Sequence, residues 1–194
     1  MSARLVVLIS GNGSNLQAIL DACARNDLPA TVIAVISNKA KAYGLTRARN
    51  AGVPAIHFPI LPDESRRDYD ARLAKEVVRY MPDYVILAGW MRLLTSNFLD
   101  CFPNRVINLH PALPGTFPGM HAIERAYEAW QHGEIDRTGV MVHLVPDEGV
   151  DDGPVLATRE IHFQPGETLD NFEARVHAIE HELLVSTLKS HITK

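Results

Sequence analysis

Short, almost wholly apolar runs recur along this chain, and segments with the three-to-four-residue spacing of amphipathic helices lie between most of them. Residues 5–9 and 31–37 are the clearest runs, and the segment after the first has Leu16, Ile19 and Leu20 on one helical face. A strand that is apolar at every position is expected in a parallel sheet covered on both sides. The alternation therefore predicts an α/β protein with a Rossmann-like, doubly wound, mostly parallel sheet.

The same pattern continues toward the C-terminus. Further strands are predicted at residues 55–58, 84–88, 106–109, 138–144 and 154–161. Helices are predicted at about residues 44–51, 65–80, 95–101, 121–131 and 169–189, with Ser65 as an N-terminal cap. The last two strands lie close together in the sequence, so the C-terminal part of the sheet is expected to be mixed rather than purely parallel.

Length and composition bound the class of protein. A chain of 194 residues, of which 46% are hydrophobic and 22% charged, predicts one soluble domain, 1–194, with a sizeable core. The net charge of −4 and the lack of a Lys/Arg run predict no nucleic-acid or anionic-membrane surface. Cys23 and Cys101 are too few for a disulfide framework. No signal-peptide pattern or membrane-length apolar run is evident, so we expect a cytoplasmic protein.

Asn108 and His110 stand two residues apart at the end of a predicted strand that stops at Pro111. Residues i and i+2 of a strand point to the same face, so the amide and the imidazole are expected to project side by side. An amide donates hydrogen bonds to a developing oxyanion, and an imidazole carries a proton near neutral pH. The pair suits addition of a nucleophile to a carbonyl. The alternative is a solvated polar strand end.

A glycine-containing loop, Gly11-Asn12-Gly13-Ser14-Asn15, joins the first predicted strand to the first helix. Glycines let backbone amides approach an anion, and a helix N-terminus adds partial positive charge. The loop lacks the Gly-Lys-Ser/Thr of a Walker motif, and Leu16 replaces the third glycine of a dinucleotide fingerprint. It is therefore predicted to hold a single phosphate, and the alternative is an ordinary tight turn.

Residues 146–154 form an acidic loop, Pro-Asp-Glu-Gly-Val-Asp-Asp-Gly-Pro, between the last two predicted strands. A carboxylate from this loop that reaches His110 would favour its protonated form and raise its pKa. The spacing of the acidic residues does not fit a calcium-binding EF-hand loop. A solvated acidic turn is the alternative.

The last predicted helix contains His177-Ala178-Ile179-Glu180-His181, a pattern that binds zinc in some hydrolases. At 3.6 residues per turn, Glu180 lies near the apolar stripe of Val176 and Leu183, and the two histidines lie further toward solvent. This arrangement disfavours zinc, which needs inward histidines. A half-buried Glu180 instead suggests a partner for a substrate cation.

Taken together and in this order, these motifs resemble the glycinamide ribonucleotide formyltransferase family of purine biosynthesis. The likeness covers nearly the whole chain and is carried by Val-Leu-Ile-Ser-Gly-Asn-Gly-Ser-Asn-Leu-Gln (7–17), Ser-Asn-Lys-Ala (37–40), Leu-Ala-Gly-Trp-Met-Arg (87–92), Asn-Leu-His-Pro (108–111), Asp-Asp-Gly-Pro (151–154) and Glu-His (180–181). Methionyl-tRNA formyltransferases and formyltetrahydrofolate hydrolases share the catalytic residues. They also carry an extra domain, for which 194 residues are expected to leave no room.

The resemblance implies the formyltransferase fold and a reaction in which the amino group of 5-phosphoribosylglycinamide attacks the formyl carbon of 10-formyltetrahydrofolate. By the family pattern, Asn108 would stabilise the oxyanion and His110 would transfer the proton. Asp151 would orient His110 and raise its pKa. Aligning on Asp-x-Gly-Pro favours Asp151, but the loop is one residue longer than in some relatives, so Asp152 remains the alternative.

The resemblance also implies two binding regions. Gly13, Ser14 and Asn15 would hold the substrate phosphate, and Glu180 would face the glycinamide end. The folate would contact a set of residues that includes Asn108, namely Arg66, Met91, Arg92, Leu93, Leu94 and Asn108. The partners are thus small-molecule substrates, with 10-formyltetrahydrofolate as co-substrate, no permanently bound cofactor and no metal. The chain is expected to be a monomer or homodimer.

Three rival functions remain at this point: hydrolysis of formyltetrahydrofolate, nucleotide binding without chemistry, and zinc-dependent hydrolysis. The loop after His110-Pro111 also departs from the family, because Ala112-Leu113-Pro114-Gly115 stands where many relatives have Ser-Leu-Leu-Pro.

Overall fold

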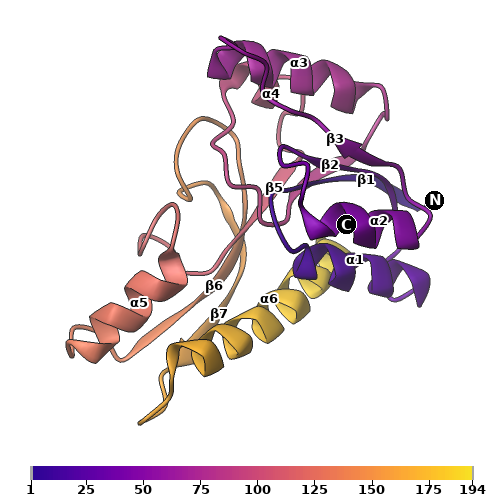
Figure 1. Ribbon diagram of the computed structural model, residues 1–194. Helices are drawn as coiled ribbons and strands as arrows, with labels where there is room; N and C mark the ends of the chain where they lie inside the picture. Colours follow the sequence, from indigo (N-terminus) through magenta and orange to yellow (C-terminus); the bar gives the residue numbers. More distant parts are fainter. Residues whose placement is uncertain (1, 194) are drawn as a thin grey trace.

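The computed structural model describes residues 2–193 and contains one sheet with the strand order β3-β2-β1-β4-β5-β6-β7 (Figure 1). The pairs from β3 to β5 are parallel, and the pairs β5–β6 and β6–β7 are antiparallel. The predicted doubly wound sheet with a mixed C-terminal part is confirmed. The strands are β1 Ala3–Ile9, β2 Ala30–Ser37, β3 Ala55–His57, β4 Tyr84–Leu87, β5 Val106–His110, β6 Arg137–Leu144 and β7 Val155–His162.

Helices cover both faces of this sheet. The buried residues of α1, α2, α5 and α6 join one core cluster, and those of α3 and α4 join the cluster on the opposite face. The helices are α1 Ser14–Ala24, α2 Tyr43–Asn50, α3 Arg66–Val78, α4 Ser96–Leu99, α5 Ala122–Gln131 and α6 Leu169–Ile192. Among residues 2–193 no helix has the length and apolarity that crossing a membrane requires.

The first strand shows why its run of residues is apolar throughout. Leu5, Val7 and Ile9 belong to one core cluster, whereas Val6 and Leu8 belong to the other, and all five are fully buried. Alternate residues of a strand face opposite sides, so a strand between two helix layers needs apolar side chains at every position. Burying each such side chain stabilises the fold by about 1.5–3 kcal/mol.

The element boundaries agree with the sequence-based prediction to within a few residues. The predicted cap is present, because the Ser65 hydroxyl oxygen accepts a hydrogen bond from the Asp68 amide at 3.1 Å. β5 extends one residue further than predicted, through His110, and α6 continues to Ile192. The extension of β5 matters, because it places His110 on the paired part of the sheet, opposite Met141.

The topology brings the ends of β1 and β4 together. β1 lies between β2 and β4, so the chain order reverses at β1, and ligands bind at such switch points beyond the carboxyl ends of the strands. Ser10, directly after β1, donates its amide to the Gly89 carbonyl at 2.9 Å, and the Ser10 hydroxyl accepts from the Met91 amide at 2.9 Å. The loops after β1 and β4 are thus tied to each other at this edge.

Candidate active site

Asn108 and His110 project from β5 to the same face, as the strand spacing predicts. His110 is only 4% exposed, and Asn108 is half-buried. On one side β4 pairs with β5 in parallel, and on the other β6 pairs with it in antiparallel register, which puts His143 directly opposite Asn108. The pair therefore lies on a strand with neighbours on both sides, and the alternative of a solvated strand end does not hold.

Asp151 joins this pair from the acidic loop between β6 and β7. Its Oδ1 accepts a hydrogen bond from Asn108 Nδ2 at 3.0 Å, and its Oδ2 lies 3.3 Å from His110 Nδ1. The Gly119 amide donates to the same Oδ2 at 2.8 Å. Asp152, by contrast, is exposed and lies against Gly149. The geometry thus places Asp151, rather than Asp152, beside His110.

The ring of His110 has an acceptor at each nitrogen, because Nε2 donates to the Phe117 carbonyl at 3.0 Å and Nδ1 faces Asp151. Burial lowers the pKa of His110, although the charge of Asp151 acts to raise it. The predicted rise in the pKa of His110 is therefore not observed. The loss of hydration lowers this pKa by more than the charge of Asp151 raises it.

For the pKa of Asp151, the neighbouring groups outweigh the effect of burial. Burial acts to raise the pKa of Asp151, but the His143 ring 3.5 Å from its Oδ1, the hydrogen bond from the Gly119 amide and the nearby His110 leave that pKa below its ordinary value. Asp151 is held at a backbone φ of 54°, in the left-handed region that Asp tolerates better than most residues. The loop thus presents an ionised carboxylate between Asn108 and His110.

The loop before α1 has the geometry of an anion site. Gly13 caps the helix with a φ of 75°, and a Cβ there would lie 2.7 Å from the Gly44 Cα, so only glycine fits. Arg47 holds this loop from α2: its Nε donates to the Asn12 carbonyl and its Nη2 to Asn12 Oδ1, each at 2.9 Å. The first amides of α1, at Ser14 and beyond, lack intrahelical acceptors and are suited to bind a phosphate.

A second polar cluster lies where α1 crosses α6. Glu180 is 4% exposed, and its Oε2 accepts from Asn15 Nδ2 at 3.1 Å and from His177 Nδ1 at 2.8 Å. The hydrogen bond to Glu180 raises the pKa of His177, which lies on the exposed side of the helix. The helical wheel predicted a half-buried Glu180 on the apolar side of the helix, and the structure buries it more fully. Within residues 2–193 no group of three or more His, Cys, Asp or Glu side chains is arranged to hold a metal.

The segment predicted to face the folate divides into two parts. Met91 and Leu93 are 53% and 45% exposed, and Arg66 Nε donates to the Leu93 carbonyl at 3.0 Å. Leu94 packs into the core beneath α3 and α4, and the guanidinium of Arg92 lies 4.9 Å from the ring centre of Tyr69. The side chains of Met91, Leu93 and Arg66 are therefore exposed, whereas Arg92 is half-buried and Leu94 is buried.

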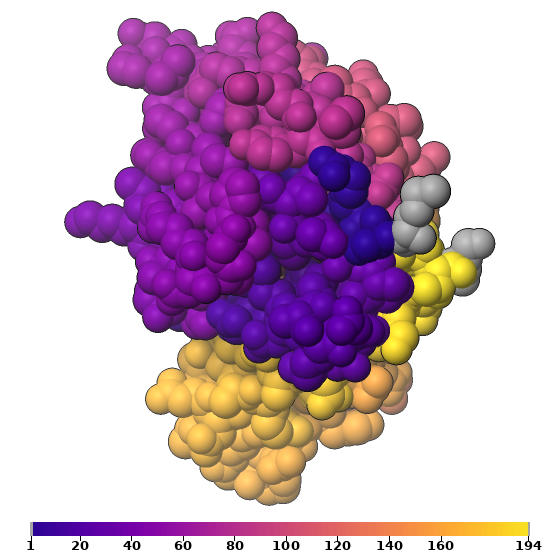
Figure 2. Space-filling view, turned by 90° about the vertical axis from the view of Figure 1, so that its right-hand side faces the viewer, coloured from indigo at the N-terminus to yellow at the C-terminus, as the bar shows by residue number. Residues whose placement is uncertain are grey.

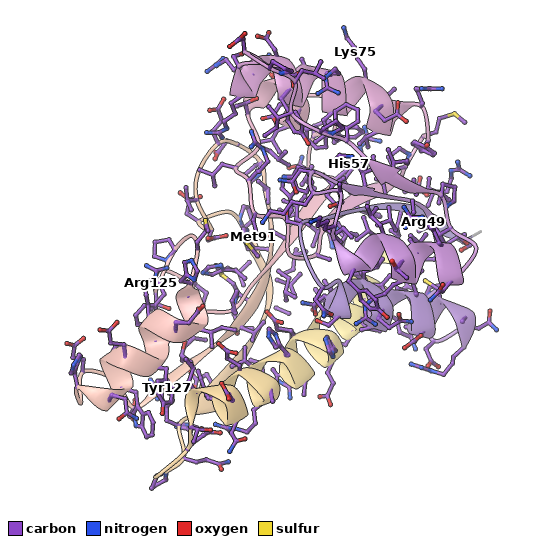
Figure 3. All side chains as sticks on the ribbon, in the orientation of Figure 1. Arg49, His57, Lys75, Met91, Arg125 and Tyr127 are labelled. Carbon is purple, nitrogen blue, oxygen red and sulfur yellow. The ribbon has the colours of Figure 1, made fainter. Side chains whose placement is uncertain are left out.

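The views of the whole molecule place these parts relative to one another. Figure 3 shows Met91 near the centre of the structure, and Arg125 at the end of α5 that lies nearer the sheet. In Figure 2 the indigo and violet atoms of the N-terminal part lie directly against the gold and yellow atoms of the C-terminal part. Between α1 and α6 a hollow of about 750 Å³ is bordered by Ser14, Arg47 and His181, so it opens beside the loop of residues 11–15.

Comparison with known proteins accounts for this arrangement. The sequence model of the formyl transferase family matches residues 3–188. The chain belongs to the formyl transferase family. It is 44% identical to the phosphoribosylglycinamide formyltransferase of Schizosaccharomyces pombe, over all of this chain and 99% of that protein. It is also 44% identical to the Escherichia coli enzyme of the same name, over 92% of this chain and 82% of that one.

Solved structures in the family have the same fold. Glycinamide ribonucleotide transformylase 1 from Geobacillus kaustophilus superposes with a TM-score of 0.91 at 38% identity, covering 98% of each chain. The corresponding protein from Symbiobacterium toebii gives a TM-score of 0.90 at 42% identity, over 97% of this chain and 86% of that one. The parallel sheet with antiparallel C-terminal strands is therefore the fold of this formyl transferase.

Several residues that this formyl transferase brings to its site could not be identified from local sequence patterns. His143 hydrogen-bonds to Asn108 at 3.0 Å, and Arg125 donates to the carbonyls of Phe117 and Pro118 at 2.8 and 2.6 Å. Alternation along β6 shows which face His143 occupies, but only the pairing register with β5 shows that it meets Asn108.

Proposed function

We propose that this chain transfers a formyl group from 10-formyltetrahydrofolate to the amino group of 5-phosphoribosylglycinamide in purine biosynthesis. The products are formylglycinamide ribonucleotide and tetrahydrofolate. Full-length relatives that carry this activity in their names support the proposal. The observation that carries it is the contact of Asp151 with both Asn108 and His110 at the carboxyl end of β5.

The chemistry follows from these three side chains. The substrate amine forms a bond to the formyl carbon, and the tetrahedral intermediate collapses when the bond from that carbon to N10 of the folate breaks. Asn108 would donate a hydrogen bond to the oxyanion of the intermediate. His110 would take a proton from the attacking amine and return one to N10. Asp151 would orient the ring of His110 and stabilise its charged form.

The ribonucleotide would lie along the start of α1. The amides at Gly13 and Ser14, at a helix end with no acidic residue in its first turn, would bind the phosphate. The Arg47 guanidinium, which already holds Asn12, would fix this loop and add positive charge. Glu180 would face the glycinamide end, since its carboxylate is held in place by Asn15 and His177.

The folate would lie on the other side of Asn108. The exposed side chains of Met91 and Leu93 suit a flat, partly apolar pterin, and Arg66 holds the backbone of this segment through the Leu93 carbonyl. Arg92 and Leu94 would contribute through their backbone, because their side chains pack toward α3. The folate is a co-substrate, and the proposed mechanism uses neither a metal nor a permanently bound cofactor.

Hydrolysis of the same folate, with water in place of the amine, is the competing reaction. The glycine loop and the Glu180 cluster favour a phosphorylated amine as acceptor, because water needs neither. An assay of tetrahydrofolate release tests this directly. We expect release only when both substrates are present, and a rate at least about 100-fold lower from His110→Ala. Equal release by the wild-type protein without the ribonucleotide would identify a hydrolase.

We further propose that residues 1–194 act as one domain in the cytoplasm, as a monomer or homodimer. The single sheet that links both ends of the described chain supports a single domain. A sedimentation measurement of molar mass at the working concentration distinguishes the two oligomeric states.

A further inference from the structure

His143 is a buried titratable residue that the proposed mechanism does not use. It is 2% exposed and lies on β6, directly opposite Asn108 in the antiparallel pairing. Its Nδ1 lies 2.9 Å from the Leu144 carbonyl oxygen, and its Nε2 lies 3.0 Å from Asn108 Nδ2. Both ring nitrogens thus have a partner inside the protein.

The two hydrogen bonds indicate the tautomer of the ring, and the other group near Nε2, Asp151 Oδ1, lies further away at 3.5 Å. A carbonyl oxygen only accepts hydrogen bonds, so Nδ1 of His143 carries the proton. The amide Nδ2 of Asn108 only donates, so Nε2 of His143 must present its lone pair. The network therefore assigns a neutral imidazole with its hydrogen on Nδ1.

This assignment accounts for both hydrogens of the Asn108 amide. One points to His143 Nε2 and the other to Asp151 Oδ1, each at 3.0 Å. An oxyanion can be stabilised only by a hydrogen that one of these acceptors gives up. His143 has no other donor for its lone pair among the residues described, whereas Asp151 also has the Gly119 amide and His110 as partners.

We propose that His143 is a positioning residue that fixes the orientation of the Asn108 amide. The lone pair of His143 Nε2 accepts one hydrogen of the Asn108 amide. The other amide hydrogen, which is bonded to Asp151 Oδ1, is then the one presented to the reacting carbonyl oxygen. The oxyanion then replaces Asp151 Oδ1, and Asp151 keeps its contacts with Gly119 and His110. The inference rests on the proposed formyl transfer and extends it to a residue outside the reacting groups.

Two substitutions separate the hydrogen-bonding role from packing. His143→Gln keeps an acceptor near the position of Nε2, whereas His143→Leu fills similar space without one. We expect kcat to fall about 10- to 100-fold in the leucine variant, less than the roughly 100- to 1,000-fold cost of removing an oxyanion donor itself. The glutamine variant should recover most of kcat, and KM for each substrate should change little in either variant.

A double-mutant comparison sharpens the test. If His143 acts through Asn108, His143→Leu should cost nothing further in an Asn108→Ala background. Equal losses in the leucine and glutamine variants, or an undiminished loss in that background, would overturn the proposal. Formyl transfer by the wild-type protein is measured first, so that failure of the proposed reaction is distinguished from failure of this assignment.

A measurement on the wild-type protein covers the case in which a variant does not fold. The ¹⁵N chemical shifts of the His143 ring should show a protonated Nδ1 and an unprotonated Nε2 at neutral pH. A ring protonated at Nε2, or a charged ring, would contradict the proposed acceptor role.

Discussion

Two clusters in this molecule are built from the same three kinds of side chain. At the end of β5, Asp151 lies between Asn108 and His110, and where α1 crosses α6, Glu180 binds Asn15 and His177. The pKa values of the two histidines are nevertheless shifted in opposite directions. Burial lowers the pKa of His110, whereas the hydrogen bond to Glu180 raises the pKa of His177.

The difference lies in hydration rather than in composition. The His110 side chain is 5% exposed, so its charged form loses most of its contact with water. The His177 side chain is 48% exposed, so it keeps much of its hydration and the carboxylate determines its shift. The buried cluster suits a group that gains and loses a proton, and the exposed one favours the protonated form of His177 beside Glu180.

The largest effect that tests this comparison is expected from His110→Ala. Loss of a general acid or base lowers turnover by about 100- to 10,000-fold. The matched change His177→Ala should alter turnover by only about threefold, because general acid–base chemistry is not assigned to it. Steady-state kinetics of both variants, with folate binding measured separately, provides the check. Similar losses of turnover in the two variants would contradict the assignment of acid–base chemistry to His110 and not to His177.

The next effect concerns the carboxylate of the buried cluster. Asp151→Asn should lower turnover by at least about tenfold, since Asp151 orients His110 and stabilises the imidazolium. Loss of that charge lowers the pKa of His110 further, so the acidic limb of the pH–rate profile should move to lower pH. Asp152→Asn is the control and should leave both turnover and profile near normal. A large effect in the control variant would mean that Asp152 is the functional carboxylate.

A smaller effect is expected in the second cluster. Glu180→Gln should raise KM for the ribonucleotide by about tenfold, roughly the 1.4 kcal/mol expected for a hydrogen bond to a charged group. It should leave KM for the folate unchanged, and the pKa of His177 should fall toward its ordinary value. Kinetics with each substrate varied in turn, together with an NMR titration of His177, measures both. A loss of kcat with normal KM would instead place Glu180 in the chemical step.

The smallest effect is on stability as pH changes. The folded pKa of His177 is raised, so its contribution is fully present below its unfolded pKa and is lost as pH rises through the folded pKa. Because the His177 side chain is half-exposed, its contribution to the free energy of unfolding is expected to be at most about 0.5 kcal/mol. His110 acts with opposite sign: its lowered folded pKa costs stability as pH falls through the unfolded pKa. Unfolding of His177→Gln and His110→Gln is measured between pH 5 and 8. In each variant the free energy of unfolding should lose the pH dependence that the replaced histidine contributes.

Local periodicity was enough to determine much of this protein. The apolar runs predicted the strands, because a strand between two helix layers must be apolar on both faces. The spacing of Asn108 and His110 predicted that they share a face, and the helical wheel predicted the burial of Glu180. Each of these inferences concerns residues within one element, where backbone geometry alone fixes the relation.

Relations between elements were decided only by the tertiary structure. The antiparallel register of β5 and β6 brings His143 to Asn108, and the left-handed backbone at Asp151 turns its carboxylate toward both members of the β5 pair. The same packing buries His110 so fully that its pKa falls despite the neighbouring carboxylate. Pairing register, loop conformation and desolvation depend on contacts between distant parts of the chain, and no local pattern in the sequence encodes them.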